Sequence, residues 1–257
     1  MPSMFVSHGS PMVVLETGPY QQALAAFGKR TRPAAIVVIS AHWGTTTEVE
    51  IASAERHHLI YDFGGFPPAL YRLQYNVTGA PELAERIAQQ LQPGRWQAHL
   101  NPARGLDHGV WVPLRLMYPG ADIPTVEVSV PLSLSPEQLF SLGQCLAPLT
   151  GEGVLILGSG GIVHNLFLFR GGPREQRPEP WAVEFDTWFK ISLESGDIGG
   201  LLQYSQRAPH ARLAVPTFEH FAPVFVTLGA AHRPATVEHI YEGFEYGHLS
   251  MRSFALA

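Results

Sequence analysis

The chain has 257 residues, of which 46% are hydrophobic and 15% are charged, a composition that excludes an intrinsically disordered protein. It carries 17 basic and 22 acidic residues, and the net charge of −5 argues against nucleic acid or an anionic membrane as a partner. The lone cysteine, Cys145, excludes an internal disulfide framework and a cysteine-rich zinc site.

No segment approaches the roughly 20 apolar residues of a membrane span, and the first residues lack the basic start of a secretion signal. We therefore expect a cytoplasmic protein with no membrane partner. No repeat, low-complexity tract or long linker divides the chain, which predicts a single domain over residues 1–257. The sequence leaves the oligomeric state open.

Short apolar runs alternate with amphipathic segments along the chain. The run 34–39 is β-branched and has no period of two, which is typical of a central strand covered on both faces. Apolar residues at helical spacing over 80–91, and Ser135 as a cap before Pro136, predict helices. The expected strands are 5–7, 34–39, 123–130, 154–157 and 249–256, the last at an edge, and the expected helices are 80–91, 135–147, 181–193 and 218–231.

This alternation predicts an α/β fold in which helices flank a central, largely parallel or mixed sheet. Such sheets bind ligands at the carboxyl ends of their strands. Three histidines, His8, His42 and His164, lie at or just after the ends of expected strands, and His220 lies at the head of an expected helix. One histidine alone is commonly a core or loop residue, but this shared context favours a metal site.

Six short motifs occur in order along nearly the whole chain. They are His8-Gly9-Ser10-Pro11, Ser40-Ala41-His42-Trp43, Asp62-Phe63-Gly64-Gly65-Phe66-Pro67, Asp107-His108-Gly109-Val110-Trp111, Val163-His164-Asn165-Leu166 and Glu219-His220. Together they resemble the DOPA 4,5-dioxygenase-like branch of the class III extradiol ring-cleavage dioxygenases, in the LigB superfamily.

The resemblance implies a single catalytic domain that opens a catechol-type aromatic ring with O₂ at one mononuclear non-haem metal. It implies His8, His42 and His220 as metal ligands, and His164 as a histidine at the metal. It also implies Fe(II) for catalysis and Zn(II) in the protein as purified. The partners would be a small aromatic diol and O₂, with no other cofactor.

The acid–base residue is expected to be His108, which the resemblance places beside the metal, or His164, whose role as ligand or base stays open. The family's usual pattern is two histidines and one carboxylate. A helical wheel over 218–231 places His220 at the edge of the apolar face and Glu219 opposite it. We therefore expect His220, rather than Glu219, to be the third ligand.

Several neighbours of these motifs are candidates for the substrate pocket, and Ser10 is expected to cap the helix that follows it. Phe63 and Phe66 are expected to face an aromatic ring from a loop over the pocket, and Trp43 and Trp111 are further candidates. The glycines at 158–161 lack the pattern of a phosphate-binding loop. Asp107 is expected to cap a loop.

Two rival interpretations remain open at this point. Histidine ligands at strand ends would serve equally well in a zinc hydrolase, with His108 or Glu219 as a proton shuttle. The second rival interpretation is a non-catalytic relative that binds metal on the same scaffold.

Overall fold

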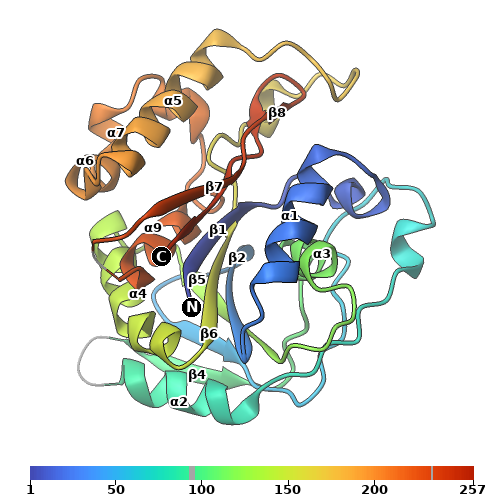
Figure 1. Ribbon diagram of the computed structural model, residues 1–257, viewed down its shortest axis with the longest axis vertical. Coiled ribbons are helices and arrows are strands. Elements are labelled where there is room, and N and C mark those ends of the chain that lie inside the picture. The colour runs from blue at the N-terminus through green and yellow to red at the C-terminus, as the bar shows by residue number, and fades with distance from the viewer. Residues whose placement is uncertain (93–95, 233) are drawn as a thin grey trace.

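A computed structural model of the chain describes residues 1–92, 96–232 and 234–257. Its main element is an eight-stranded mixed sheet with the strand order β4-β3-β5-β2-β6-β1-β10-β7 (Figure 1). The strands of this sheet are β1 (Ser3–Ser7), β2 (Ala35–Thr45), β3 (Val49–Ala52), β4 (Ala98–Asn101), β5 (Thr125–Pro131), β6 (Val154–Gly160), β7 (Val237–Tyr241) and β10 (Ser253–Leu256). The short strands β8 (Phe244–Glu245) and β9 (Leu249–Ser250) pair with each other.

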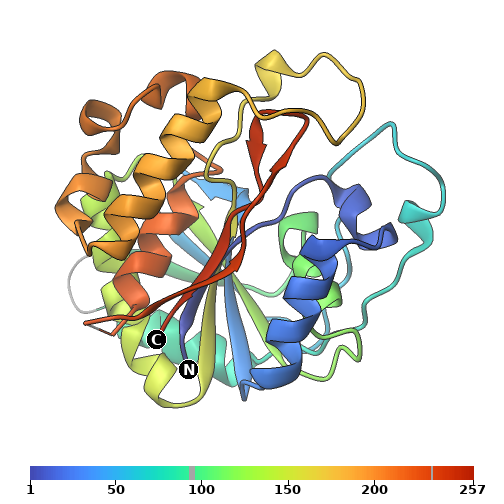
Figure 2. The same cartoon turned by 45° about the horizontal axis from the view of Figure 1, so that its top comes forward.

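Helices cover both faces of this sheet (Figure 2). One face carries α1 (Pro19–Arg30) and α3 (His108–Met117), and the other carries α2 (Pro81–Leu91), α4 (Pro136–Gly151), α5 (Pro180–Glu194) and α9 (Ala222–Ala230). The short helical segments are η1 (Pro11–Leu15), η2 (Leu70–Arg72), η3 (Leu166–Leu168), α6 (Ile198–Leu202), α7 (Tyr204–Arg207) and α8 (Ala211–Ala214). The expected α/β architecture is therefore confirmed.

Residues of the central strands alternate between two separate cores. In β2, Val37 and Ile39 pack on the α4–α9 side, whereas Ile36 and Val38 pack on the α1–α3 side. This explains why the apolar run shows no period of two. The capping box predicted in part by Ser135 is present, because its hydroxyl accepts from the Gln138 N–H and the Gln138 side chain accepts from the Ser135 N–H.

The structure corrects several of the expected element bounds. The predicted last strand is broken into β9 and β10, and β10 lies between β1 and β7 rather than at an edge. The helix predicted to begin at Phe218 begins at Ala222, with Pro223 in its first turn. The strand predicted over 154–157 continues through the following glycine-rich residues as far as Gly160.

The neighbouring strands β5, β2, β6 and β1 are parallel, so their carboxyl ends meet at one edge of the sheet. The strands β3, β4 and β7 extend the sheet beyond those expected from sequence. Within the three described ranges, no helix combines the length and apolarity needed to cross a membrane.

Candidate metal centre

Five histidines from five different segments meet at this edge of the sheet. His8 follows β1, His42 lies near the end of β2, and His108 is the first residue of α3. His164 follows β6, and His220 lies in the turn before α9. Ring centroids are 4.9 Å apart for His8 and His42, and 5.0 Å for His42 and His220.

Three of these imidazoles, those of His8, His42 and His220, each offer a ring nitrogen within 4.8 Å of the others. Glu219 lies beside this group, and its carboxylate oxygen Oε1 is 3.2 Å from Nδ1 of His220. The exposed fraction of the Glu219 side chain is 32%, against 10% for His220. The structure therefore places His220, and not Glu219, in this group of possible ligands, although the wheel assumed a helix that has not yet begun there.

Each of the three imidazoles has an oxygen next to its Nδ1 atom. Nδ1 of His8 lies 3.0 Å from the Ser159 hydroxyl, which donates its own hydrogen to the Gly109 carbonyl and so accepts from His8. Nδ1 of His42 lies 3.2 Å from Oδ2 of Asp62. With the hydrogen on Nδ1 in each ring, every Nε2 atom keeps a free lone pair.

This arrangement fits a divalent metal. The Nε2 atoms of His8 and His42 are 3.1 Å apart, so one ring must donate a hydrogen to the other unless a cation beside both lets each keep its lone pair. Metal–nitrogen bonds are about 2.0–2.1 Å long, which is compatible with such a separation. Metal-bound histidines commonly donate their other N–H to an oxygen, and an oxygen that can accept it lies beside Nδ1 of all three rings.

The electrostatics keep the rings of His8, His42 and His164 neutral. Burial, followed by repulsion from the neighbouring imidazoles, holds the pKa of His8 well below its usual value. The same two causes lower the pKa of His42 to about 2, although Asp62 opposes them. Burial and His220 lower the pKa of His164 to about 3. Neutral imidazole is the form that binds a metal.

A carboxylate that sequence reasoning missed, Asp62, joins two of the histidines. Its Oδ1 atom lies 2.9 Å from Nδ1 of His108 and 3.0 Å from the His108 backbone nitrogen. Burial raises the pKa of Asp62, but hydrogen bonds and charge from His108 outweigh this and lower it to about 2. The sequence contained a signal for this role, because Asp62 is the first residue of the Asp62–Pro67 motif, from which only the two phenylalanines were predicted to lie at the pocket.

His164 stacks against His220, with ring centroids 3.6 Å apart and planes 9° from parallel. It does not belong to the group of ligand atoms within 4.8 Å.

Asp107 occupies the cap position of α3, but its carboxylate makes no capping bond. The carboxylate instead accepts from the Ser40 hydroxyl at 2.7 Å and from Arg104 at 2.6 Å.

The histidines lie on a cavity of about 440 Å³. Its wall is largely apolar and includes Phe63, Phe66, Val163, Leu166, Phe169, Leu249 and Met251. Ser10, Phe63 and Phe66 were expected at the pocket and do line it, and the Ser10 hydroxyl also caps η1. Among the described residues, the pocket candidates Trp43 and Trp111 do not line it.

The two tryptophans have other packing roles. Trp111 is fully buried in the core and lies behind Phe63, with ring centroids 6.3 Å apart. Trp43 is also buried, and the Arg104 guanidinium lies 4.6 Å from its ring centroid. Tyr246, Leu249 and Met251 line the cavity instead, from a part of the chain that carried no motif.

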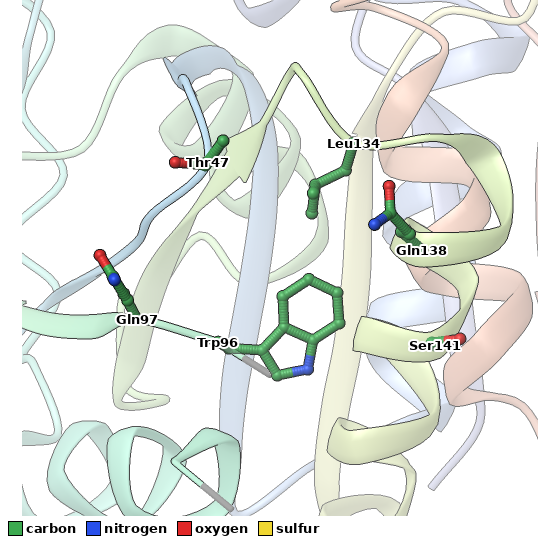
Figure 3. Close-up of a pocket in the computed structure, with 6 residues that line it drawn as sticks. All are labelled: Thr47, Trp96, Gln97, Leu134, Gln138 and Ser141. Atoms are coloured by element: carbon green, nitrogen blue, oxygen red, sulfur yellow. The ribbon is translucent and has the colours of Figure 1, made fainter. Parts of the chain in front are cut away.

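A second cavity, of about 430 Å³, lies between the β4 end of the sheet and α4 (Figure 3). Its lining residues are Thr47, Trp96, Gln97, Leu134, Gln138 and Ser141. No histidine or carboxylate is among the described residues that line it, and both groups of possible metal ligands found in the described parts of the chain lie at the first cavity.

An α/β sheet with clustered imidazoles at the ends of parallel strands defines a class of metal-binding domain. Residues 2–256 match the family described as the catalytic LigB subunit of aromatic ring-opening dioxygenase. The chain belongs to this family.

Curated relatives match over most of their length. The chain is 40% identical to a 4,5-DOPA dioxygenase extradiol of Beta vulgaris, covering 98% of this chain and 95% of that protein. It is 39% identical to a 4,5-DOPA dioxygenase extradiol of Escherichia coli, covering 98% and 93%. The crystal structure of an uncharacterized Escherichia coli K12 protein superposes with a TM-score of 0.85 at 35% identity and covers both chains fully.

Proposed function

We propose that this protein is an extradiol dioxygenase that opens the ring of a catechol-type aromatic with O₂ at one non-haem metal. The observation that carries the proposal is the convergence of His8, His42 and His220 at the wall of an apolar cavity. Membership of the LigB family supports the reaction class. Relatives named for DOPA support a DOPA-like catechol as substrate.

In this proposal His8, His42 and His220 hold the metal through their Nε2 atoms, and His164 stands beside His220. When bound, the metal makes a catechol hydroxyl more acidic and brings the diol and O₂ together for ring opening. The three imidazoles contribute no negative charge, which favours Zn(II) in the protein as purified. We expect Fe(II) for catalysis because the family's ring-opening reaction uses O₂.

The chain's own residues bind the ring and move the proton. Phe63 and Phe66 form an edge-to-face pair, with centroids 5.4 Å apart, that can receive an aromatic ring and keep water from it. Nδ1 of His108 is occupied by Asp62, so Nε2 is the nitrogen available at the cavity wall. That atom takes the proton of the second hydroxyl and holds it for a later return.

The test is anaerobic reconstitution of the protein with Fe(II), followed by oxygen uptake across a panel of catechols that includes DOPA. We expect uptake together with the visible absorbance of yellow ring-opened products. His42→Ala is the matched control and should show neither. A fully Fe(II)-loaded protein that consumes no oxygen with any catechol would contradict the proposal.

The three-histidine donor set also suits a zinc hydrolase. The same preparation loaded with Zn(II) separates the two functions, because a hydrolase needs neither Fe(II) nor O₂. A non-catalytic relative would bind metal and show neither activity.

A further inference from the structure

The carboxylate of Asp62 lies between two histidines that have different roles in the proposed reaction. Oδ2 faces Nδ1 of His42 at 3.2 Å, and Oδ1 faces Nδ1 of His108 at 2.9 Å. Oδ1 also accepts the backbone N–H of His108 at 3.0 Å. The centroids of the two rings are 4.0 Å apart, so one side chain contacts both members of a close pair.

The segment that carries Asp62 is attached to the region around α3. The Ile60 N–H donates to the Leu106 carbonyl at 2.8 Å, and the Leu106 N–H donates to the His58 carbonyl at 2.9 Å. Nε1 of Trp111, inside α3, donates to the Ile60 carbonyl at 3.2 Å. These bonds place Asp62 relative to His108, although Asp62 itself lies in a loop.

We propose that Asp62 is a positioning residue that fixes the hydrogen of both His42 and His108 on Nδ1. A carboxylate only accepts hydrogen bonds, so each imidazole must carry its hydrogen on the nitrogen that faces Asp62. The lone pair of each ring is thereby placed on Nε2. In His42 this lone pair is available to the metal, and in His108 it is available to the substrate hydroxyl. The role of His108 as proton acceptor rests on the proposed function, whereas the Nδ1–H tautomers of His42 and His108 do not depend on it.

Asp62→Asn distinguishes the two histidines. An amide has one accepting oxygen and one donating NH₂ group. The oxygen should stay beside His108, because the backbone N–H of that residue needs an acceptor and cannot relocate its hydrogen. The NH₂ group then faces His42, whose hydrogen must move to Nε2, the atom needed for the metal.

The first measurement is ¹⁵N–¹H NMR of histidine-labelled, metal-free protein. The unsubstituted protein should show Nδ1–H forms for His42 and His108, and Asp62→Asn should move His42, but not His108, to the Nε2–H form. The second is competition for Zn(II), in which Asp62→Asn should bind about 10–100-fold more weakly, the usual loss when a hydrogen-bond partner of a ligand is removed.

Two variants serve as controls. Glu219→Gln replaces the charged partner of His220 with a neutral amide, so it should weaken Zn(II) binding but leave the His42 and His108 signals unchanged. The exposed Glu82→Gln should change neither measurement. If Asp62→Asn does not fold, Asp62→Ala removes both acceptors, and both histidines should lose their preference for Nδ1–H.

The proposal is overturned if the tautomers and the Zn(II) affinity of the Asp62 variants match those of the unsubstituted protein. Neither measurement requires turnover of a catechol. A protein that shows these shifts but opens no ring would therefore refute the proposed function and leave the role of Asp62 standing.

Discussion

At the scale of single residues, the centre is a set of imidazoles in which each Nδ1 atom lies beside an oxygen of a neighbouring side chain. Ser159, Asp62 and Glu219 supply these oxygens to His8, His42 and His220. Burial keeps the pKa of His8 and His42 low, so no proton needs to leave these two rings before a metal binds near neutral pH. Ligation can therefore be tested one side chain at a time.

The ligand assignment predicts that His8→Ala, His42→Ala and His220→Ala each lose stoichiometric metal, because each removes a nitrogen of a three-nitrogen set. Glu219→Gln should keep the metal when the metal is in excess, since it alters only a partner of His220. Elemental analysis after gel filtration measures both. If His8→Ala and His42→Ala both kept their full metal content, these two residues would not be metal ligands.

The second prediction at this scale concerns His108 as the proton acceptor. His108→Ala should remain folded and metal-replete, because the proposed ligands are His8, His42 and His220, and the second possible group, which contains His108, shares only His42 with them. Loss of a general acid–base typically lowers kcat by about 10²–10⁴, or roughly 3–5 kcal/mol of barrier. Steady-state kinetics on the best catechol measures kcat. A near-normal kcat would exclude His108 as the proton acceptor and assign that role to His164.

At the scale of elements, the end of β6 holds two of the proposed ligands in place. The Gly160 carbonyl accepts the His8 N–H at 3.1 Å, and the Gly161 N–H donates to the His220 carbonyl at 2.9 Å. A Cβ at Gly160 would lie 2.0 Å from that same carbonyl oxygen. The glycines after 154–157 thus allow the His220 turn to approach the strand.

Gly160→Ala should therefore displace His220 and lower the stability by about 1–3 kcal/mol, the usual cost of overpacking. Metal affinity should fall as well. Gly151→Ala is the matched control, since a Cβ there meets nothing within 4 Å. Urea unfolding measures the stability, and metal competition measures the affinity. Equal stability and equal metal affinity in the two variants would contradict a close approach of the His220 carbonyl to Gly160.

At the scale of the whole molecule, the buried histidines link stability to pH. Their pKa values in the folded protein lie below 6.5, the value expected in the unfolded chain. The unfolded chain therefore binds more protons below pH 6.5, and the free energy of unfolding falls as the pH falls. The lowered pKa values of Asp62 and Glu219 act only at more acidic pH.

We expect the metal-free protein to lose stability between pH 7 and pH 5, by up to about 2 kcal/mol for each such histidine. Denaturant unfolding at several pH values measures the slope. His8→Gln should make it shallower, whereas His99→Gln, at an exposed side chain, should leave it unchanged. A free energy of unfolding that is flat over this range would show that the folded protein accepts protons at these rings.

Much of this organisation could be predicted from the sequence. The alternation of apolar runs and amphipathic segments predicted the α/β class, because burial on two faces leaves a continuous apolar run. The placement of His8, His42 and His164 near strand ends predicted that they would meet, because parallel strands end at one edge of a sheet. Local patterns report such features directly.

Tertiary contacts decided the rest. Asp62 contacts His42 and His108 from 20 and 46 positions away, through a loop held by long-range bonds, and no local pattern encodes such a meeting. The inner place of β10 depends on pairing with β1 and β7, and the burial of Trp111 depends on what α3 packs against. The sequence by itself determined the residue types and the sheet edge at which they gather. The fold alone determined the partner of each ring nitrogen, because hydrogen bonds between distant segments exist only after the chain has closed.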